Sequence, residues 1–87
     1  MTKKEDIQAI IDGVSQIWGV ELIDSVRSRY IWTAKLMKQY SDEEIIGGAE
    51  WLKKHSKPLT ISQLYFAMPR YLHDKKVEEN KRRWQFE

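Results

Sequence analysis

Residues 41–64 constrain the fold more than any other part of the chain. A serine opens this stretch and Glu44 follows three positions later, a spacing at which two side chains cap the start of a helix. A basic turn and Pro58 then interrupt the helical pattern. Thr60 and Gln63 repeat the capping spacing. A chain punctuated in this way is expected to fold as consecutive helices joined by short turns.

Apolar residues recur every three or four positions along nearly the whole chain, which is typical of helices with one buried face. We predict helices over residues 4–18, 25–40 and 42–55, and a fourth that begins after Pro58. The expected buried stripes are Ile7, Ile10, Ile11, Val14, Ile17 and Trp18 in the first helix, Val26, Tyr30, Ala34, Met37 and Tyr40 in the second, Ile45, Ile46, Ala49 and Leu52 in the third, and Ile61, Leu64, Tyr65 and Met68 in the fourth.

Local signals predict how these helices begin and end. Thr2 and Glu5 have capping-box spacing at the first helix, and Gly19 is a natural stop for it because glycine accepts the left-handed conformation. Asp24 is the expected N-cap of the second helix. Pro69 lacks a backbone N–H, so we expect it to end or bend the fourth helix.

Two features indicate close packing between helices. Trp32 and Leu36 lie beside the stripe of the second helix, so this helix should be central, with Trp32 buried and two neighbours in contact. Gly47 and Gly48 weaken the third helix by about 2 kcal/mol relative to alanines. Close approach of another helix is the favoured explanation, and a bend or a ligand contact is the alternative.

The composition changes after the second proline. Residues 1–69 carry the apolar stripes and are expected to form the core, whereas residues 70–87 are mostly charged and form a C-terminal helix or tail. The predicted fold is all-α, a small bundle of four helices with an additional or extended C-terminal helix. At 87 residues without cysteine, the chain depends on packing for its stability.

No group of residues predicts catalysis, a metal site or a cofactor. His55 and His73 lie in hydrophilic stretches without zinc-ligand spacing, and Gly47–Gly48 lacks the pattern of a phosphate loop. Glu43 and Glu44 are explained by a helix start. Since no catalytic group is recognisable, we expect a non-enzymatic protein. Because the chain shows neither a signal-peptide pattern nor an apolar run long enough to cross a bilayer, we expect it to be cytoplasmic with no membrane contact.

Two basic clusters are candidates for binding: Lys53, Lys54, His55 and Lys57 around the turn after the third helix, and Lys81, Arg82 and Arg83 before Trp84. A solvated surface is the favoured explanation of the first cluster and an equally good explanation of the second. The net charge of +2 is too small to argue for nucleic acid by itself. Basic residues beside an aromatic ring are nevertheless typical of single-stranded nucleic-acid binding. The candidate nucleic-acid residues are Lys53, Lys54, Lys57, Lys75, Lys76 and Lys81. The candidate partner-binding residues at the C-terminus are Arg82, Arg83, Trp84 and Phe86.

A helix-turn-helix is an alternative reading of the third and fourth helices. Ser62 and Gln63 follow the turn and have side chains able to reach base edges. The connection is longer than usual for this motif and contains Pro58 where glycine is more typical.

The second predicted helix carries Trp32 with Leu36, the third carries Gly47 to Ala49, and Lys57-Pro58-Leu59 precedes the fourth. With this pattern the chain resembles the N-terminal domain of phage replicative-helicase loaders, both the lambda-type replication protein P and the helicase loader/inhibitor of Gram-positive phages. The resemblance covers residues 7–71. The chain departs from the family in being shorter and in having Thr60 and Ile61 where the loaders have further prolines. The matching residues are Ile11 to Val14, Trp32 with Leu36, Asp42 to Glu44, Gly47 to Ala49, Lys57-Pro58-Leu59, Ser62 and Phe66.

The resemblance implies an adaptor in phage DNA replication that binds a replicative helicase or an initiator protein, without bond chemistry of its own. The helicase-gripping part of such loaders lies in their C-terminal region. Single-stranded or duplex DNA is a further possible partner, and the oligomeric state stays open. The alternatives are a small DNA-binding module and a phage-encoded regulator or inhibitor of a host protein.

Overall fold

The computed structural model describes the backbone of residues 4–86 and the side chains of residues 4–80. Its helices are α1 (Lys4–Trp18), α2 (Val26–Gln39), α3 (Asp42–His55) and α4 (Ile61–Phe86). The described residues contain no strand, which confirms the all-α prediction. The expected bounds of the first three helices agree with the structure to within one residue at either end.

The helix starts are fixed by the side chains that the spacing predicted. At α3, the Glu44 N–H donates to Ser41 Oγ at 3.2 Å and the Ser41 N–H donates to Glu44 Oε1 at 2.9 Å. The Ser41 N–H stabilises the Glu44 carboxylate directly, and the Ser41 side chain adds to this, so the pKa of Glu44 lies below its ordinary value. At α4, Thr60 and Gln63 make the corresponding pair of bonds, at 3.3 and 3.0 Å. The Thr2 and Glu5 pair involves a residue outside the described part of the chain.

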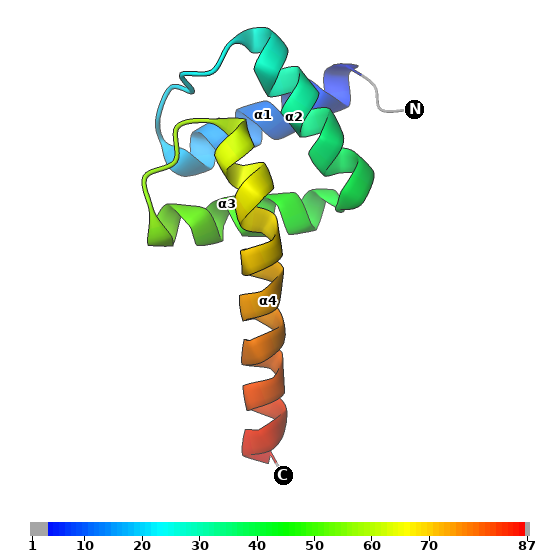
Figure 1. Ribbon diagram of the computed structural model, residues 1–87, viewed down its shortest axis with the longest axis vertical. Helices are drawn as coiled ribbons and strands as arrows, with labels where there is room; N and C mark the ends of the chain where they lie inside the picture. Colours follow the sequence, from blue (N-terminus) through cyan, green and yellow to red (C-terminus); the bar gives the residue numbers. More distant parts are fainter. Residues whose placement is uncertain (1–3, 87) are drawn as a thin grey trace.

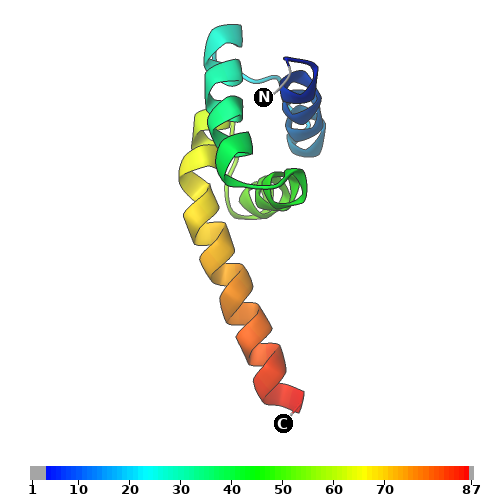
Figure 2. The same ribbon diagram turned by 90° about the vertical axis from the view of Figure 1, so that its right-hand side faces the viewer.

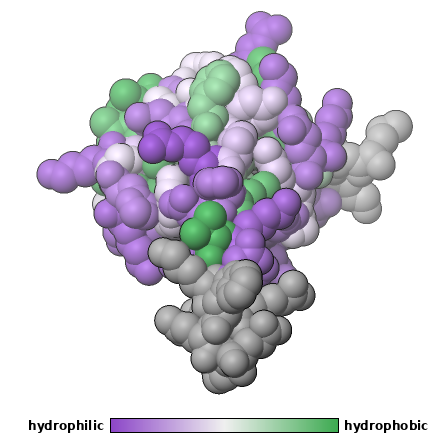
Figure 3. All heavy atoms as spheres, turned by 60° about the horizontal axis from the view of Figure 1, so that its bottom comes forward, coloured by the Kyte–Doolittle hydropathy of each residue, from purple (hydrophilic) through white to green (hydrophobic). Residues whose placement is uncertain are grey.

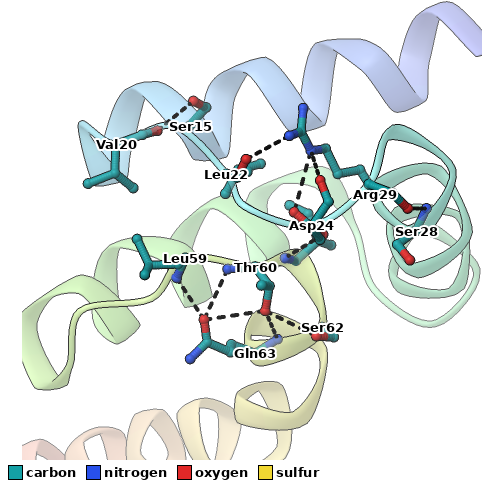
Figure 4. Close-up of polar contacts among 12 residues, drawn as sticks. Ser15, Val20, Leu22, Asp24, Ser28, Arg29, Leu59, Thr60, Ser62 and Gln63 are labelled. Atoms are coloured by element: carbon teal, nitrogen blue, oxygen red, sulfur yellow. Dashed lines mark hydrogen bonds and ion pairs between the residues drawn. The ribbon is translucent and has the colours of Figure 1, made fainter.

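The start of α2 differs from the prediction. Ser25 is its N-cap and accepts from the Ser28 N–H at 3.2 Å. Asp24, the expected cap, lies in the loop before α2 and has a different role. One carboxylate oxygen accepts from the Ile61 N–H at 3.3 Å, and the other lies 3.4 Å from Arg29 Nε (Figure 4). Asp24 therefore joins two distant helix starts instead of capping its own.

Helices α2 and α3 lie between α1 and the N-terminal part of α4. Each of these two helices packs against α1 and also against α4. Beyond this bundle α4 continues as a single rod, with the C-terminal end of the helix far from α1, α2 and α3 (Figures 1 and 2). The molecule is accordingly elongated, with extents of 48 × 30 × 18 Å.

The core lies where the four helices meet, and the predicted stripes of α1, α3 and α4 supply most of it. The indole N–H of Trp18 donates to the Ala49 carbonyl at 3.0 Å across this core. Ile17, Ile46 and Tyr65 are only partly buried at its margin. The buried apolar residues are Ile7, Ile10, Ile11, Val14, Trp18, Leu22, Leu36, Ile45, Ala49, Leu52, Ile61, Leu64 and Met68.

Helix α2 was predicted less well. Val26 is 62% exposed because it occupies the first turn, where its side chain points back past the start of the helix. Thr33 and Leu36 are fully buried instead, and the Thr33 hydroxyl has no hydrogen-bond partner among the described residues. Trp32 was expected to be buried, but it is only partly covered. Helix α2 packs mainly against α1 and α4, which agrees with the two neighbours predicted, and it also touches α3.

Pro69 does not end α4, so the expectation of a break is wrong and the extended-helix alternative is confirmed. Pro69 is exposed. The carbonyl of Tyr65, four residues earlier, loses its helical donor on the side of α4 that water reaches, which keeps the cost of the proline low enough for the helix to continue.

The two glycines of α3 face α4 closely, as the favoured explanation required. A Cβ added at Gly47 would meet the Tyr71 hydroxyl, and one added at Gly48 would meet the Met68 sulfur. The Tyr71 ring also lies 3.4 Å from that second position. Side chains of α4 therefore fill the space that Cβ atoms on α3 would occupy.

These contacts predict opposite effects for alanine at the two positions. Gly47→Ala displaces only the far end of the half-buried Tyr71 side chain and removes the cost of a glycine inside a helix. The free energy of unfolding of the protein should therefore rise by up to about 1 kcal/mol. Gly48→Ala pushes on the fully buried Met68, so it should be destabilising by about 1–2 kcal/mol. Urea unfolding of both variants measures the difference. Equal stabilities would mean that Met68 has another rotamer available.

Candidate binding surfaces

Among the described residues, no group of three or more histidine, cysteine and acidic side chains could hold a metal ion. Both histidines are exposed, as expected of surface residues. His55 packs its ring against Trp51, with centroids 4.5 Å apart. No described helix is both long and apolar enough to cross a membrane.

An open groove follows the line where the C-terminal half of α3 meets the middle of α4. Trp51 lies in this groove, and its ring centroid is 6.1 Å from that of Tyr71. The groove has two hollows of about 570 and 620 Å³, and both are bordered by Trp51, His55 and Asp74. Phe66 and Arg70 border the second hollow. The groove offers aromatic faces with charges of both signs, so it can bind a polar partner but contains no enclosed site.

The structure disperses the predicted nucleic-acid residues. Lys53, Lys54 and Lys57 are exposed around the end of α3, and Lys75 and Lys76 are exposed on the projecting part of α4. Lys54 and Lys75 border one hollow, which three carboxylates also border: Glu50, Asp74 and Glu78. Lys53 and Lys54 border another hollow, again with Glu50. This set therefore does not form a uniformly positive surface. The side chain of Lys81 lies outside the described residues.

The predicted partner-binding residues belong to the projecting end of α4. The helix continues to Phe86, so its backbone places Arg82, Arg83 and Trp84 beyond the bundle. Their side chains, like that of Phe86, lie outside the described residues. On the face where α4 leaves the bundle, the described apolar residues form small separate patches among hydrophilic ones (Figure 3).

The two side chains expected to read DNA bases are engaged at the start of α4. The Gln63 amide oxygen accepts from the N–H groups of Leu59 and Thr60 at 2.6 and 3.0 Å (Figure 4). The Ser62 hydroxyl lies 3.1 Å from that of Thr60. Both side chains thus help to form the connection between α3 and α4.

Sequence reasoning missed a surface formed by α2 and the first turns of α4. Arg27, Lys35 and Lys38 are exposed on α2, and none of them forms an ion pair with a described residue. Beside them, Trp32 packs against Phe66, with ring centroids 5.4 Å apart. We call these five residues the basic-aromatic surface. The available signal was that Val26–Gln39 contains no acidic residue, whereas the predicted clusters were chosen because their basic residues are adjacent in sequence.

Comparison with protein-family models, curated proteins and solved structures found no match to this chain.

Proposed function

We propose that this chain is a non-enzymatic adaptor that binds a protein partner through the projecting part of α4. The observation that carries the proposal is the exposure of this helix. Its 26 residues extend for about 39 Å, and every described side chain from residue 73 to residue 80 is exposed. The described part of α4 beyond residue 72 thus lies outside the core.

A helix that projects without packing is suited to recognition. An isolated helical segment of this length is only marginally stable in water, and helices gain most of their stability from tertiary contacts. A partner that receives the helix in a groove would supply those contacts. The ordered backbone of α4 would carry the charges of Arg82 and Arg83 and the rings of Trp84 and Phe86 to that partner.

The resemblance to phage helicase loaders supports a replicative helicase or an initiator protein as the partner. In this role the chain would act by binding more tightly to one conformation of the partner, which shifts the conformational equilibrium without any covalent step. The bundle would hold α4 in a fixed direction, and the groove at Trp51 would be a second contact region.

Purified full-length chain and a replicative helicase hexamer test the proposal directly. We expect co-elution at moderate salt and a loss of affinity of about thirtyfold for Trp84→Ala, the effect of removing one interface hot spot. Gln16→Ala, an exposed change on α1, is the control and should bind normally. The melting temperature of Trp84→Ala should equal that of the parent chain.

Three results would contradict the adaptor. Unchanged affinity of Trp84→Ala would place the contact elsewhere, and a large fall in its melting temperature would assign Trp84 to the fold. Failure to bind either helicase or initiator, together with recovery of nucleic acid that salt removes, would favour the small DNA-binding module, because phosphate contacts are lost steeply as salt increases.

A further inference from the structure

The solvent side of α2 is positively charged along its whole length. Arg27, Lys35 and Lys38 are six, two and five residues from Thr33, which is fully buried. At about 100° per residue they fall within about a quarter of the helix circumference, on the side opposite the buried face. From Arg27 to Lys38 the helix rises about 16 Å. This side therefore presents a row of three cations.

No carboxylate of α2 or of the adjoining turns of α4 offsets this charge. Val26–Gln39 contains no aspartate or glutamate, and neither do residues 61–70. The remaining cation of α2, Arg29, is bound to Asp24 and to the carbonyl of Leu22. Asp24 exposes only 10% of its side chain. The row of three cations lacks the alternation of signs that is typical of a merely solvated helix surface.

Aromatic rings lie at the edge of this row. Trp32 contacts Tyr65 and Phe66 with centroid distances of 5.1 and 5.4 Å, and Phe66 is 66% exposed. The Lys35 ammonium lies 4.7 Å from the centroid of Trp32. A large exposed ring costs free energy unless something covers it. Here cations and accessible π-faces lie on one surface.

We propose that the basic-aromatic surface binds single-stranded DNA. The phosphates lie along Arg27, Lys35 and Lys38, and unpaired bases stack on Phe66 and Trp32. Charge complementarity between a row of unpaired cations and a phosphate backbone identifies the ligand as a polyanion, and the rings identify one with π-faces. The site is separate from residues 82–86, the main contact of the proposed adaptor, and shares only Phe66 with the groove at Trp51, so the two functions can be tested independently.

The same geometry selects among polyanions. A duplex hides its base faces from the two rings, and an acidic peptide has no base to stack on them. Reading a ribose 2′-hydroxyl requires free polar groups nearby. The neighbouring polar side chains are instead bonded to each other, since Gln39 Nε2 donates to the Tyr65 hydroxyl at 3.1 Å and the hydroxyls of Ser62 and Thr60 lie 3.1 Å apart. These bonds reduce the number of free polar groups beside the rings, so we expect no marked preference for RNA.

Fluorescence anisotropy of the full chain with labelled oligothymidylate of about 15 nucleotides tests the site. Binding should weaken with salt with a log–log slope of about −2 for three phosphate contacts. Lys35→Glu with Lys38→Glu should lower the affinity about tenfold or more and flatten the slope. The matched control, Lys53→Glu with Lys54→Glu, makes the same charge change on exposed residues of α3 and should retain the parent affinity. An equal loss in both pairs would overturn the site.

Tryptophan fluorescence measures the stacking of bases on Trp32 separately from the phosphate contacts. Oligothymidylate should quench tryptophan fluorescence in the parent chain, and Trp32→Phe should remove most of that quenching while it retains binding. Phe66→Ala, at an exposed position, should weaken binding about fivefold to a hundredfold without changing the melting temperature. Circular dichroism confirms that each variant is folded.

Competitors complete the test. Duplex DNA and polyglutamate should compete poorly against oligothymidylate. Equal competition by polyglutamate would identify the surface as a site for acidic protein segments, and tighter binding of duplex DNA would support a groove-binding mode. A marked preference for RNA of the same base sequence would mean that the 2′-hydroxyl is read. Each of these three results would overturn the proposal.

Discussion

Trp18→Ala should lower the free energy of unfolding by about 3–5 kcal/mol, the largest effect that we expect from a single substitution. Trp18 is only 5% exposed and lies where α1 crosses α3. Its removal would leave a cavity among apolar neighbours and an Ala49 carbonyl without the indole donor. Urea unfolding, followed by circular dichroism, measures the change. In a domain of this size such a loss would consume most of the stability.

Two further variants separate the contributions. Trp18→Phe retains much of the buried area but removes the hydrogen bond to Ala49, so it should cost about 1–3 kcal/mol. Trp32→Ala should be less costly than Trp18→Ala, because Trp32 is only partly covered. The reverse order would mean that the core is centred on α2 and α4 rather than on the contact between α1 and α3.

The comparison of these two tryptophans shows what local sequence can predict. Trp18 belongs to the apolar stripe of its helix and Trp32 lies beside the stripe of its own, and both were expected to be buried. Only the arrangement of the four helices decides which ring is enclosed. Most signals that act within one turn were read correctly, although Ser25 and not Asp24 caps α2. The capping pair of Ser41 and Glu44 and the positive φ of 64° at Gly19 are of this kind. Pro69 was given too much weight as a helix break, because only the structure shows that it lies on the solvent side of α4.

The candidate surfaces show the same limit. Clusters of basic residues that are adjacent in sequence, such as Lys53 and Lys54, were easily noticed, yet the structure places carboxylates beside part of that set. The basic-aromatic surface instead combines residues spread over α2 with Phe66, which lies on α4. No local pattern joins them, because they become neighbours only when α2 packs against α4.

Asp24→Ala should destabilise the fold by about 2 kcal/mol, although Asp24 belongs to a loop. Its carboxylate accepts from the first N–H of α4 at Ile61 and pairs with Arg29, whose side chain is 26% exposed. The adjacent Ile23 N–H donates to the Leu59 carbonyl at 3.0 Å, so the two loops are joined at several points. Loss of the carboxylate would leave a partly buried guanidinium and an Ile61 N–H without its acceptor.

Hydrogen exchange distinguishes this explanation from a general loss of stability. The Ile61 amide should lose protection in Asp24→Ala more than the amides of α1 do, because its acceptor is removed directly. Asp24→Asn retains an oxygen acceptor but not the charge, so its cost should be intermediate. Asp12→Ala, which removes an exposed carboxylate bonded to Gln8 within α1, is the matched control and should cost less than about 0.5 kcal/mol. If Asp24→Ala were no more costly than this control, the connection between the α1–α2 and α3–α4 loops would have to depend on Ile23 and Leu59 instead.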